Sequence, residues 1–279
     1  MNNNHLHHEI WNALDMDILL FVFILILLII YIVATILSNR HYKRWSLYRS
    51  VFWVLGLICM AIAVVGPLAH RAHNDFTVHM LVHLLLGMLA PIFIALAAPM
   101  TLFLRTINVR TARRLSRILK SRPLQILTHP IIATLLNLGG LWILYTTSLY
   151  SMMHESILLH LFIHFHVFIA GYLFTTSMIY VDLISHRYSY MYRSIILIVA
   201  SAGHGILSKY IYAHPPAGVV TEQAEIGGVL MYYGGDFIDI VLIFILCLQW
   251  SRDSRQRTKV NNIVKSWNLS DFLKLKTLK

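Results

Sequence analysis

The sequence predicts an all-α membrane protein: a bundle of seven transmembrane helices with its N-terminus outside the cell and its C-terminus inside. Two observations support this prediction. First, the 279 residues are 58% hydrophobic and only 13% charged, with a mean hydropathy of +0.67, whereas soluble proteins hold about 25% charged residues. Second, the basic residues alternate along the chain in a way that sets the orientation of the helices.

Seven apolar runs are long enough to cross a bilayer core of about 30 Å, which takes about 20 helical residues. They cover residues 18–37, 50–68, 79–104, 131–150, 157–181, 193–213 and 226–250. Together they form one membrane domain, 18–250, between a short outer tail at 1–17 and a basic cytoplasmic tail at 251–279. The first run is not a cleavable signal peptide, because no basic stretch precedes it and it is long enough to span.

The basic residues predict the topology. All but two of the 23 Lys and Arg residues lie in four alternate segments, 38–49, 105–130, 182–193 and 251–279. Lys and Arg are enriched on the cytoplasmic side of membrane proteins, so these segments are expected inside, in a multi-pass protein of the plasma membrane. The net charge of +11 then reflects orientation and contact with anionic membrane lipids, and it does not indicate nucleic acid.

Two stretches predict departures from a simple bundle. Pro91 and Pro99 lie within the third run, and because proline removes a backbone donor, this helix is expected to bend or break. The inner stretch 105–122 alternates arginines with apolar residues and is expected to lie as an amphipathic helix on the membrane surface. Paired glycines in the fourth and seventh runs indicate close helix packing.

Histidines gather on one side of the predicted membrane. All but three of the 16 histidines lie toward the outer side, the exceptions being His41, His129 and His186. An imidazole inside a bilayer is costly and needs a partner, so an intramembrane cluster is a functional-site hypothesis. The candidate metal ligands come from the third, fifth and sixth runs: His79, His83, His160, His164 and His204.

Four of these histidines form two pairs with a spacing of four residues, in the stretches HMLVH and HLFIH. Residues four apart share a helix face, so His79 with His83, and His160 with His164, are expected to hold one metal ion. Imidazole suits zinc, copper, iron and nickel, and the thioether of Met80 beside them favours copper.

Other polar residues are expected around this site. His166 follows His164 by two residues and so lies about 200° around the helix from it; it is expected to act indirectly or as a relay. The same role is expected for Asp236, a carboxylate deep in the last run that must be neutral, paired or metal-bound. His70, His73 and Glu222 stand near the outer ends of their runs and are expected at the entrance.

Three stretches of the chain resemble the multi-span CtaG family of membrane proteins, which are needed to assemble caa3-type cytochrome c oxidase. They are HMLVHLLLGMLAPIFIALAAPMTLFLR, HESILLHLFIHFHVFIAGYLF and EQAEIGGVLMYYGGDF. One departure is Glu222-Gln223, where the family favours Asp-Gln. The resemblance implies a non-enzymatic assembly factor whose partners are oxidase subunits and whose task concerns the oxidase's copper, by delivery or insertion.

Other functions remain open from the residues themselves. Histidines on separate helices can also ligate haem, which would make the chain a haem-binding membrane oxidoreductase or haem-handling protein, although paired ligands on one helix face suit a single ion better. A copper or proton transporter is a third reading, with Asp236 as its key residue. Hydrolytic catalysis has no nucleophile, base and orienting residue to support it. Cys59 and Cys247 lie at different depths, so no disulfide is expected.

Overall fold

The structure, a computed structural model, describes residues 3–184 and 186–276, and every regular element in that part of the chain is a helix. The first half contains α1 (Asn3–His41), α2 (Leu47–Val64), α3 (Pro67–Ala72), α4 (Phe76–His83), the π-helix η1 (Leu84–Leu89), α5 (Ala90–Ala97), α6 (Pro99–Thr106), α7 (Val109–Leu119) and α8 (Arg122–Leu127). The second half contains α9 (Pro130–Thr134), the π-helix η2 (Leu135–Gly139), α10 (Gly140–Thr146), α11 (Leu149–Glu155), α12 (Ile157–Met178), α13 (Tyr190–Ala213) and α14 (Thr221–Lys276).

Six helices are long and apolar enough to cross a membrane, so the all-α membrane class is confirmed. They are Met16–His41, Leu47–Val64, Phe76–Thr106, Ile157–Met178, Tyr190–Ala213 and Thr221–Lys259. The predicted span 131–150 corresponds to a pair of helical segments, Pro130–Thr146 and Leu149–Glu155, which meet at 79°. The described chain therefore has six candidate spans, or seven if this bent pair counts as one.

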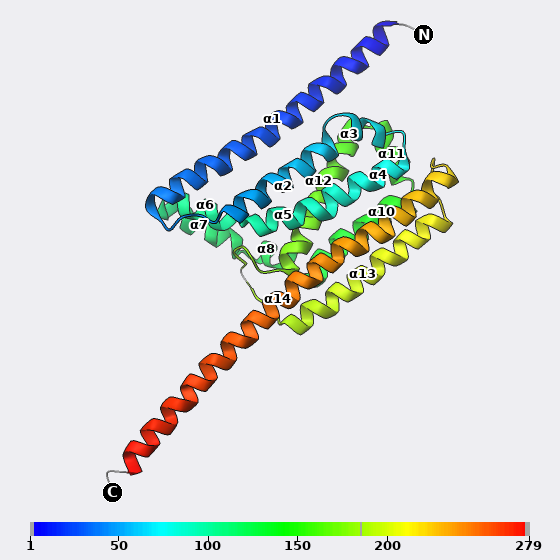
Figure 1. The fold of residues 1–279 in the computed structure, drawn as a ribbon. Coiled ribbons are helices and arrows are strands. Elements are labelled where there is room, and N and C mark those ends of the chain that lie inside the picture. The colour runs from blue at the N-terminus through cyan, green and yellow to red at the C-terminus, as the bar shows by residue number, and fades with distance from the viewer. Residues whose placement is uncertain (1–2, 185, 277–279) are drawn as a thin grey trace.

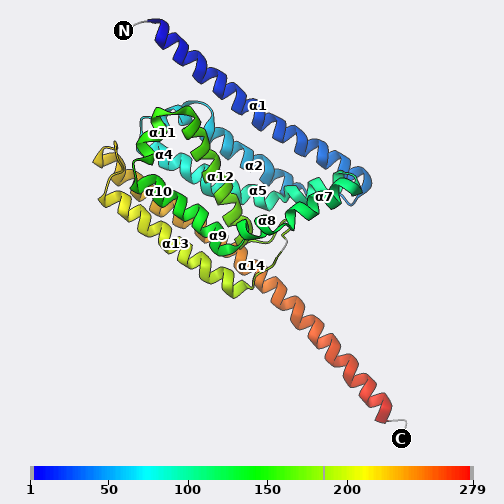
Figure 2. The same ribbon diagram turned by 180° about the vertical axis from the view of Figure 1, so that it is seen from behind.

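The predicted tails continue the helices beside them. α1 already begins at Asn3 and α14 runs on to Lys276, because neither segment contains a proline or glycine between its membrane part and its end. Figures 1 and 2 show the second half of α14 extending beyond the bundle. The side chains of residues 1–15 and 260–279 lie outside the described part of the structure.

The basic segments gather at one end of the bundle. The turn from α1 to α2, the helices α6 to α8 and the start of α13 lie at this end, which we call the basic end, whereas α3 and α11 lie at the opposite end (Figures 1 and 2). The predicted amphipathic stretch is present as α7, an 11-residue helix with no buried residue. The inside-or-outside assignment of the two ends remains a prediction.

The predicted break in the third run is confirmed at Pro99. α5 ends at Ala97, and Ala98 takes a left-handed conformation (φ 51°) before α6 begins. From the loop after α12, Asp182 accepts hydrogen bonds from the backbone N–H groups of Met100 and Thr101, both at 2.8 Å. The first N–H groups of a helix have no partner within it. The Asp182 carboxylate, far along the chain, therefore stabilises the start of α6.

A different adjustment occurs at Pro91, which lies in the first turn of α5 directly after η1. Proline has no N–H to bond the carbonyl of Gly87, four residues earlier. That carbonyl faces the backbone of α12 so closely at Gly171 that a Cβ there would overlap the oxygen. The helix that carries the histidine pair therefore packs against α12 through backbone.

Close packing through glycine is also confirmed in α14. A Cβ at Gly227 would come within 2.8 Å of Phe76 on α4, and one at Gly228 within 2.9 Å of the Ser208 carbonyl on α13. The helix Phe76–Thr106 is the most buried of the six candidate spans. Its central place brings the α4 histidines within reach of α12 and α13.

Candidate functional site

The start of α4, which carries two predicted ligands, is fixed by caps. The Asp75 side chain accepts hydrogen bonds from the N–H groups of Thr77 (2.8 Å) and Val78 (3.2 Å). Gln223 of α14 accepts one from the Phe76 N–H at 3.1 Å. These bonds satisfy donors that the first turn of a helix leaves free, so the register of α4 is set against α14.

Four histidines, which we call the mouth histidines, line a large cavity near the α3–α11 end: His73, His154, His160 and His164. The ring of His160 stacks on His73 at 4.4 Å and on His164 at 4.1 Å between ring centres. His73 lies outside the candidate spans, and burial, together with the neighbouring His70, lowers its pKa. A neutral imidazole keeps a lone pair for a ligand.

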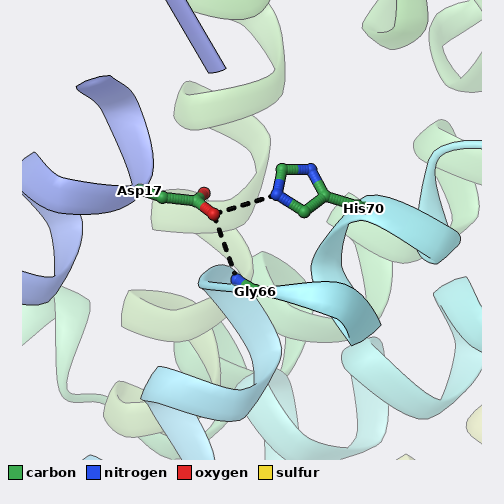
Figure 3. A network of polar contacts seen from close by, with 3 residues as sticks. All are labelled: Asp17, Gly66 and His70. Carbon is green, nitrogen blue, oxygen red and sulfur yellow. Dashed lines mark hydrogen bonds and ion pairs between the residues drawn. The ribbon is translucent and has the colours of Figure 1, made fainter. Parts of the chain in front are cut away.

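The large cavity has a volume of about 620 Å³ and is mostly apolar. Its walls come from α1, α2, η1 and α12, including Leu20, Phe23, Met60, Leu161 and Phe168. Asp17 and His70 also line it. Figure 3 shows how they join α1 to the α2–α3 turn: Asp17 Oδ2 lies 2.9 Å from His70 Nε2 and accepts a hydrogen bond from the Gly66 N–H at 3.3 Å.

His79 is buried among aromatic rings behind the mouth histidines. Its Nε2 lies 3.1 Å from the Tyr145 hydroxyl, and its ring centre lies 5.0 Å from Tyr150. The ring of His164 on α12 faces it at 6.2 Å, with the two planes at 89°. A cavity of about 10 Å³ adjoins this pair, and His83 lines the same cavity.

His83 and His204 form a second pair across helices, between α4 and α13. Their ring centres are 6.1 Å apart, with planes at 22°, and the residues are 5% and 6% exposed. A cavity of about 20 Å³ beside them is also lined by Met88, Asn137 and Asp239. Within the described residues, none of the four ring nitrogens has a hydrogen-bond partner.

The other predicted residues occupy different positions. His166 lies near the carbonyl of Leu136 in η2, with Nε2 at 3.3 Å. Met80 is fully buried in the apolar core beside α14 and lines none of the three cavities. Glu222 is exposed in the first turn of α14. Asp239, rather than Asp236, lines the cavity beside His204.

The structure groups the five predicted ligands differently from their spacing in the sequence. The sequence predicted pairs on one helix around a single ion. In the structure the rings of one such pair, His160 and His164, stack face to face. The rings whose centres are about 6 Å apart come from different helices: His79 with His164, and His83 with His204. In the described part of the chain, no group of three or more His, Cys, Asp or Glu side chains is arranged to hold a metal ion. The histidines therefore face one another in pairs from different helices.

Several residues of this region were not singled out from the sequence. Tyr145 and Tyr150 surround His79, Asn137 lines the cavity beside His83, and Asp17 closes the edge of the large cavity. Isolated tyrosines and a single asparagine in apolar runs have no regular spacing that would mark them as part of a site. Asp17 directly precedes the first apolar run, and that position was its only signal in the sequence.

Residues 29–253 match the family described as cytochrome c oxidase caa3 assembly factor (Caa3_CtaG). The match covers most of the chain. The chain belongs to this family. Membership accounts for the resemblance seen in the histidine, Ala-Pro and glycine stretches, all of which lie within the matched residues.

Similar curated proteins come from mycobacteria and are uncharacterised. One from Mycobacterium leprae is 24% identical over 81% of this chain, and ones from Mycobacterium bovis and Mycobacterium tuberculosis are each 27% identical over 78%. The chain spans only 36% to 38% of the length of these relatives. No solved structure matches the chain.

Proposed function

We propose that this chain handles copper during the assembly of a caa3-type cytochrome c oxidase and passes the ion to an oxidase subunit. Membership of the assembly-factor family supports the oxidase as partner. One observation supports a metal cargo: imidazoles from α4, α12 and α13 face one another in cross-helix pairs beside small cavities. Imidazole and thioether ligands suit copper.

The cavity sizes favour a single ion over haem. The cavities beside the His79–His164 and His83–His204 pairs measure about 10 and 20 Å³, about the space of one water molecule. Axial ligation of haem needs a porphyrin between the two rings, and these cavities do not admit one. Of these three cavities in the described part of the chain, only the large one has room for a group of that size. A haem-loaded protein would show a strong Soret band.

In the proposed topology the basic end is cytoplasmic, as Lys and Arg distribution in membrane proteins predicts. The large cavity then opens toward the outer side of the plasma membrane. Copper arriving from outside meets His70 and His73 first, both of which line this cavity, and His160 and His164 next.

The test is the metal content of the oxidase. In a strain that lacks this gene, we expect the oxidase to form with haem but without its full copper, and the native gene should restore the copper. His83→Ala and His164→Ala should not restore it, whereas His214→Ala, an exposed histidine at the end of α13, should. A fully copper-loaded oxidase in the deletion strain would overturn the proposal. Loss of total cell copper instead would indicate a transporter.

A further inference from the structure

Histidine, methionine, asparagine and aspartate side chains from five elements line the small cavity beside His83 and His204. His83 ends α4, Met88 belongs to η1, Asn137 to η2, and His204 and Asp239 to α13 and α14. Single π-helical turns occur frequently at functional sites, and both π-helices of the described chain contribute to this cavity. A volume of about 20 Å³ holds one small ion or one water molecule.

The two imidazoles aim unpaired nitrogens into this part of the interior. Both residues are more than nine-tenths buried, and within the described residues neither nitrogen of either ring is hydrogen-bonded. Buried polar groups in proteins nearly always have partners. A neutral imidazole carries one N–H and one lone pair. The two facing rings therefore offer one lone pair each, and a metal ion is a ligand that accepts both.

The distance between the rings fits one shared ion. A metal–nitrogen bond of about 2.0 Å from each ring, with the ring radius added on both sides, places two ring centres about 6 Å apart. The His83 and His204 centres are 6.1 Å apart. His160 and His164, at 4.1 Å, are too close for an ion between their centres.

Glycines hold the two rings in place. A Cβ at Gly235 would lie 2.7 Å from Nδ1 of His204, and one at Gly87 would lie 3.3 Å from Nδ1 of His83. A side chain at Gly235 would overlap the His204 ring, and one at Gly87 would press against the His83 ring. The backbone of α14 and η1 therefore contacts the rings directly.

The charge of Asp239 and the types of ligand around the cavity indicate which metal ion fits. Asp239 is 6% exposed, and a buried charge is tolerated when it is paired; an ionised Asp239 neutralises one positive charge. Met88 offers a thioether, and soft ligands select Cu(I). Two imidazoles are a sufficient ligand set for Cu(I), which accepts low coordination numbers. A monovalent copper ion suits the two imidazoles and the thioether, and Asp239 lies in the wall of the same cavity.

We propose that His83, His204 and Met88 form an inner Cu(I) station, with Asp239 in the wall of the same cavity. An outer station lies between His79 and His164, whose ring centres are 6.2 Å apart. This inference rests on the proposed function and adds the route within the protein. His83 lines both small cavities, so it connects the two stations. Copper passes inward by ligand exchange: the bond to His164 breaks as the bond to His204 forms, with no change of oxidation state.

The test is an anaerobic titration of the full chain in detergent with Cu(I), in competition with a chromophoric chelator. We expect two ions for the native protein and one for His204→Gln, with the inner affinity reduced at least about 100-fold. His164→Gln should also bind one ion, through the inner station. His214→Gln, at the residue that directly follows the same helix, is the control and should bind two.

X-ray absorption of the His164→Gln protein checks the ligands. We expect two nitrogen ligands and one sulfur, and the sulfur should disappear when Met88→Leu is added. Native protein that binds a single ion, unaffected by His204→Gln, would overturn the inner station and leave the proposed function standing. Native protein that binds no Cu(I) would overturn direct copper handling altogether. Circular dichroism establishes that each variant is folded.

Discussion

Individual residues show which part of the site the sequence contains and which part it does not. The spacing of the histidines in HMLVH and HLFIH singled out His160 and His164, which line the large cavity, and His79, whose ring faces His164. It did not identify their partners, because i,i+4 spacing describes one helix face and the partner depends on how two helices meet. His204, which faces His83 at 6.1 Å, has no neighbour in sequence that marks it as a partner.

Tyr145 is the residue whose role can be tested most directly. Its hydroxyl lies 3.1 Å from His79 Nε2, and both side chains are buried. Tyr145→Phe leaves that imidazole nitrogen without its partner, so we expect the free energy of unfolding to fall by about 1–3 kcal/mol. Thermal unfolding in detergent measures this, with Tyr212→Phe, an exposed tyrosine, as control. Equal losses in the two variants would contradict the role of the bond.

At the scale of helices, hydropathy predicts lengths and prolines predict breaks, but capping partners far along the chain are not visible. The break at Pro99 followed from proline chemistry, whereas Asp182, 81 residues beyond Thr101, became its cap only through folding. The π-helices η1 and η2 were also not predicted, since they depend on local packing and carry no periodic pattern in the sequence.

Asp182→Ala is expected to destabilise the α6 end of the bundle. The substitution removes hydrogen bonds to the N–H groups of Met100 and Thr101 and to the Thr101 hydroxyl. Loss of a helix cap costs about 0.5–2 kcal/mol. Hydrogen exchange should therefore increase at residues 99–106 while exchange in α13 stays unchanged. Unchanged exchange in α6 would show that the cap is dispensable.

Gly171→Ala tests the close backbone packing of α12 against η1. A methyl group at this position meets the carbonyl oxygen of Gly87, a backbone atom that cannot rotate away. Overpacking of this kind costs about 1–3 kcal/mol, so α12 and η1 should separate and the melting temperature in detergent should fall. Gly139→Ala is the control, since a Cβ there meets nothing within 4 Å.

The whole molecule has two chemically different ends, and this asymmetry was the most reliable prediction from sequence. Alternating basic segments fall together at the basic end (Figure 1), as their spacing between apolar runs required. The fourth run was harder to predict: its helix bends by 79° between Thr146 and Leu149, and no proline or glycine marks that point. This bend places α11 so that the His154 ring lies 5.9 Å from the ring of His73, with Tyr150 beside it.

The orientation of these two ends decides whether copper meets the histidines from outside, and cysteine labelling measures it. In a Cys59→Ala, Cys247→Ser background, Glu155→Cys should react with a membrane-impermeant maleimide in intact cells, because α11 belongs to the end that carries the histidines. Thr111→Cys, on α7 at the basic end, should react only after the cells are made permeable. The reverse pattern would place the large cavity on the cytoplasmic side, and copper would then have to enter the pathway from the cytoplasm.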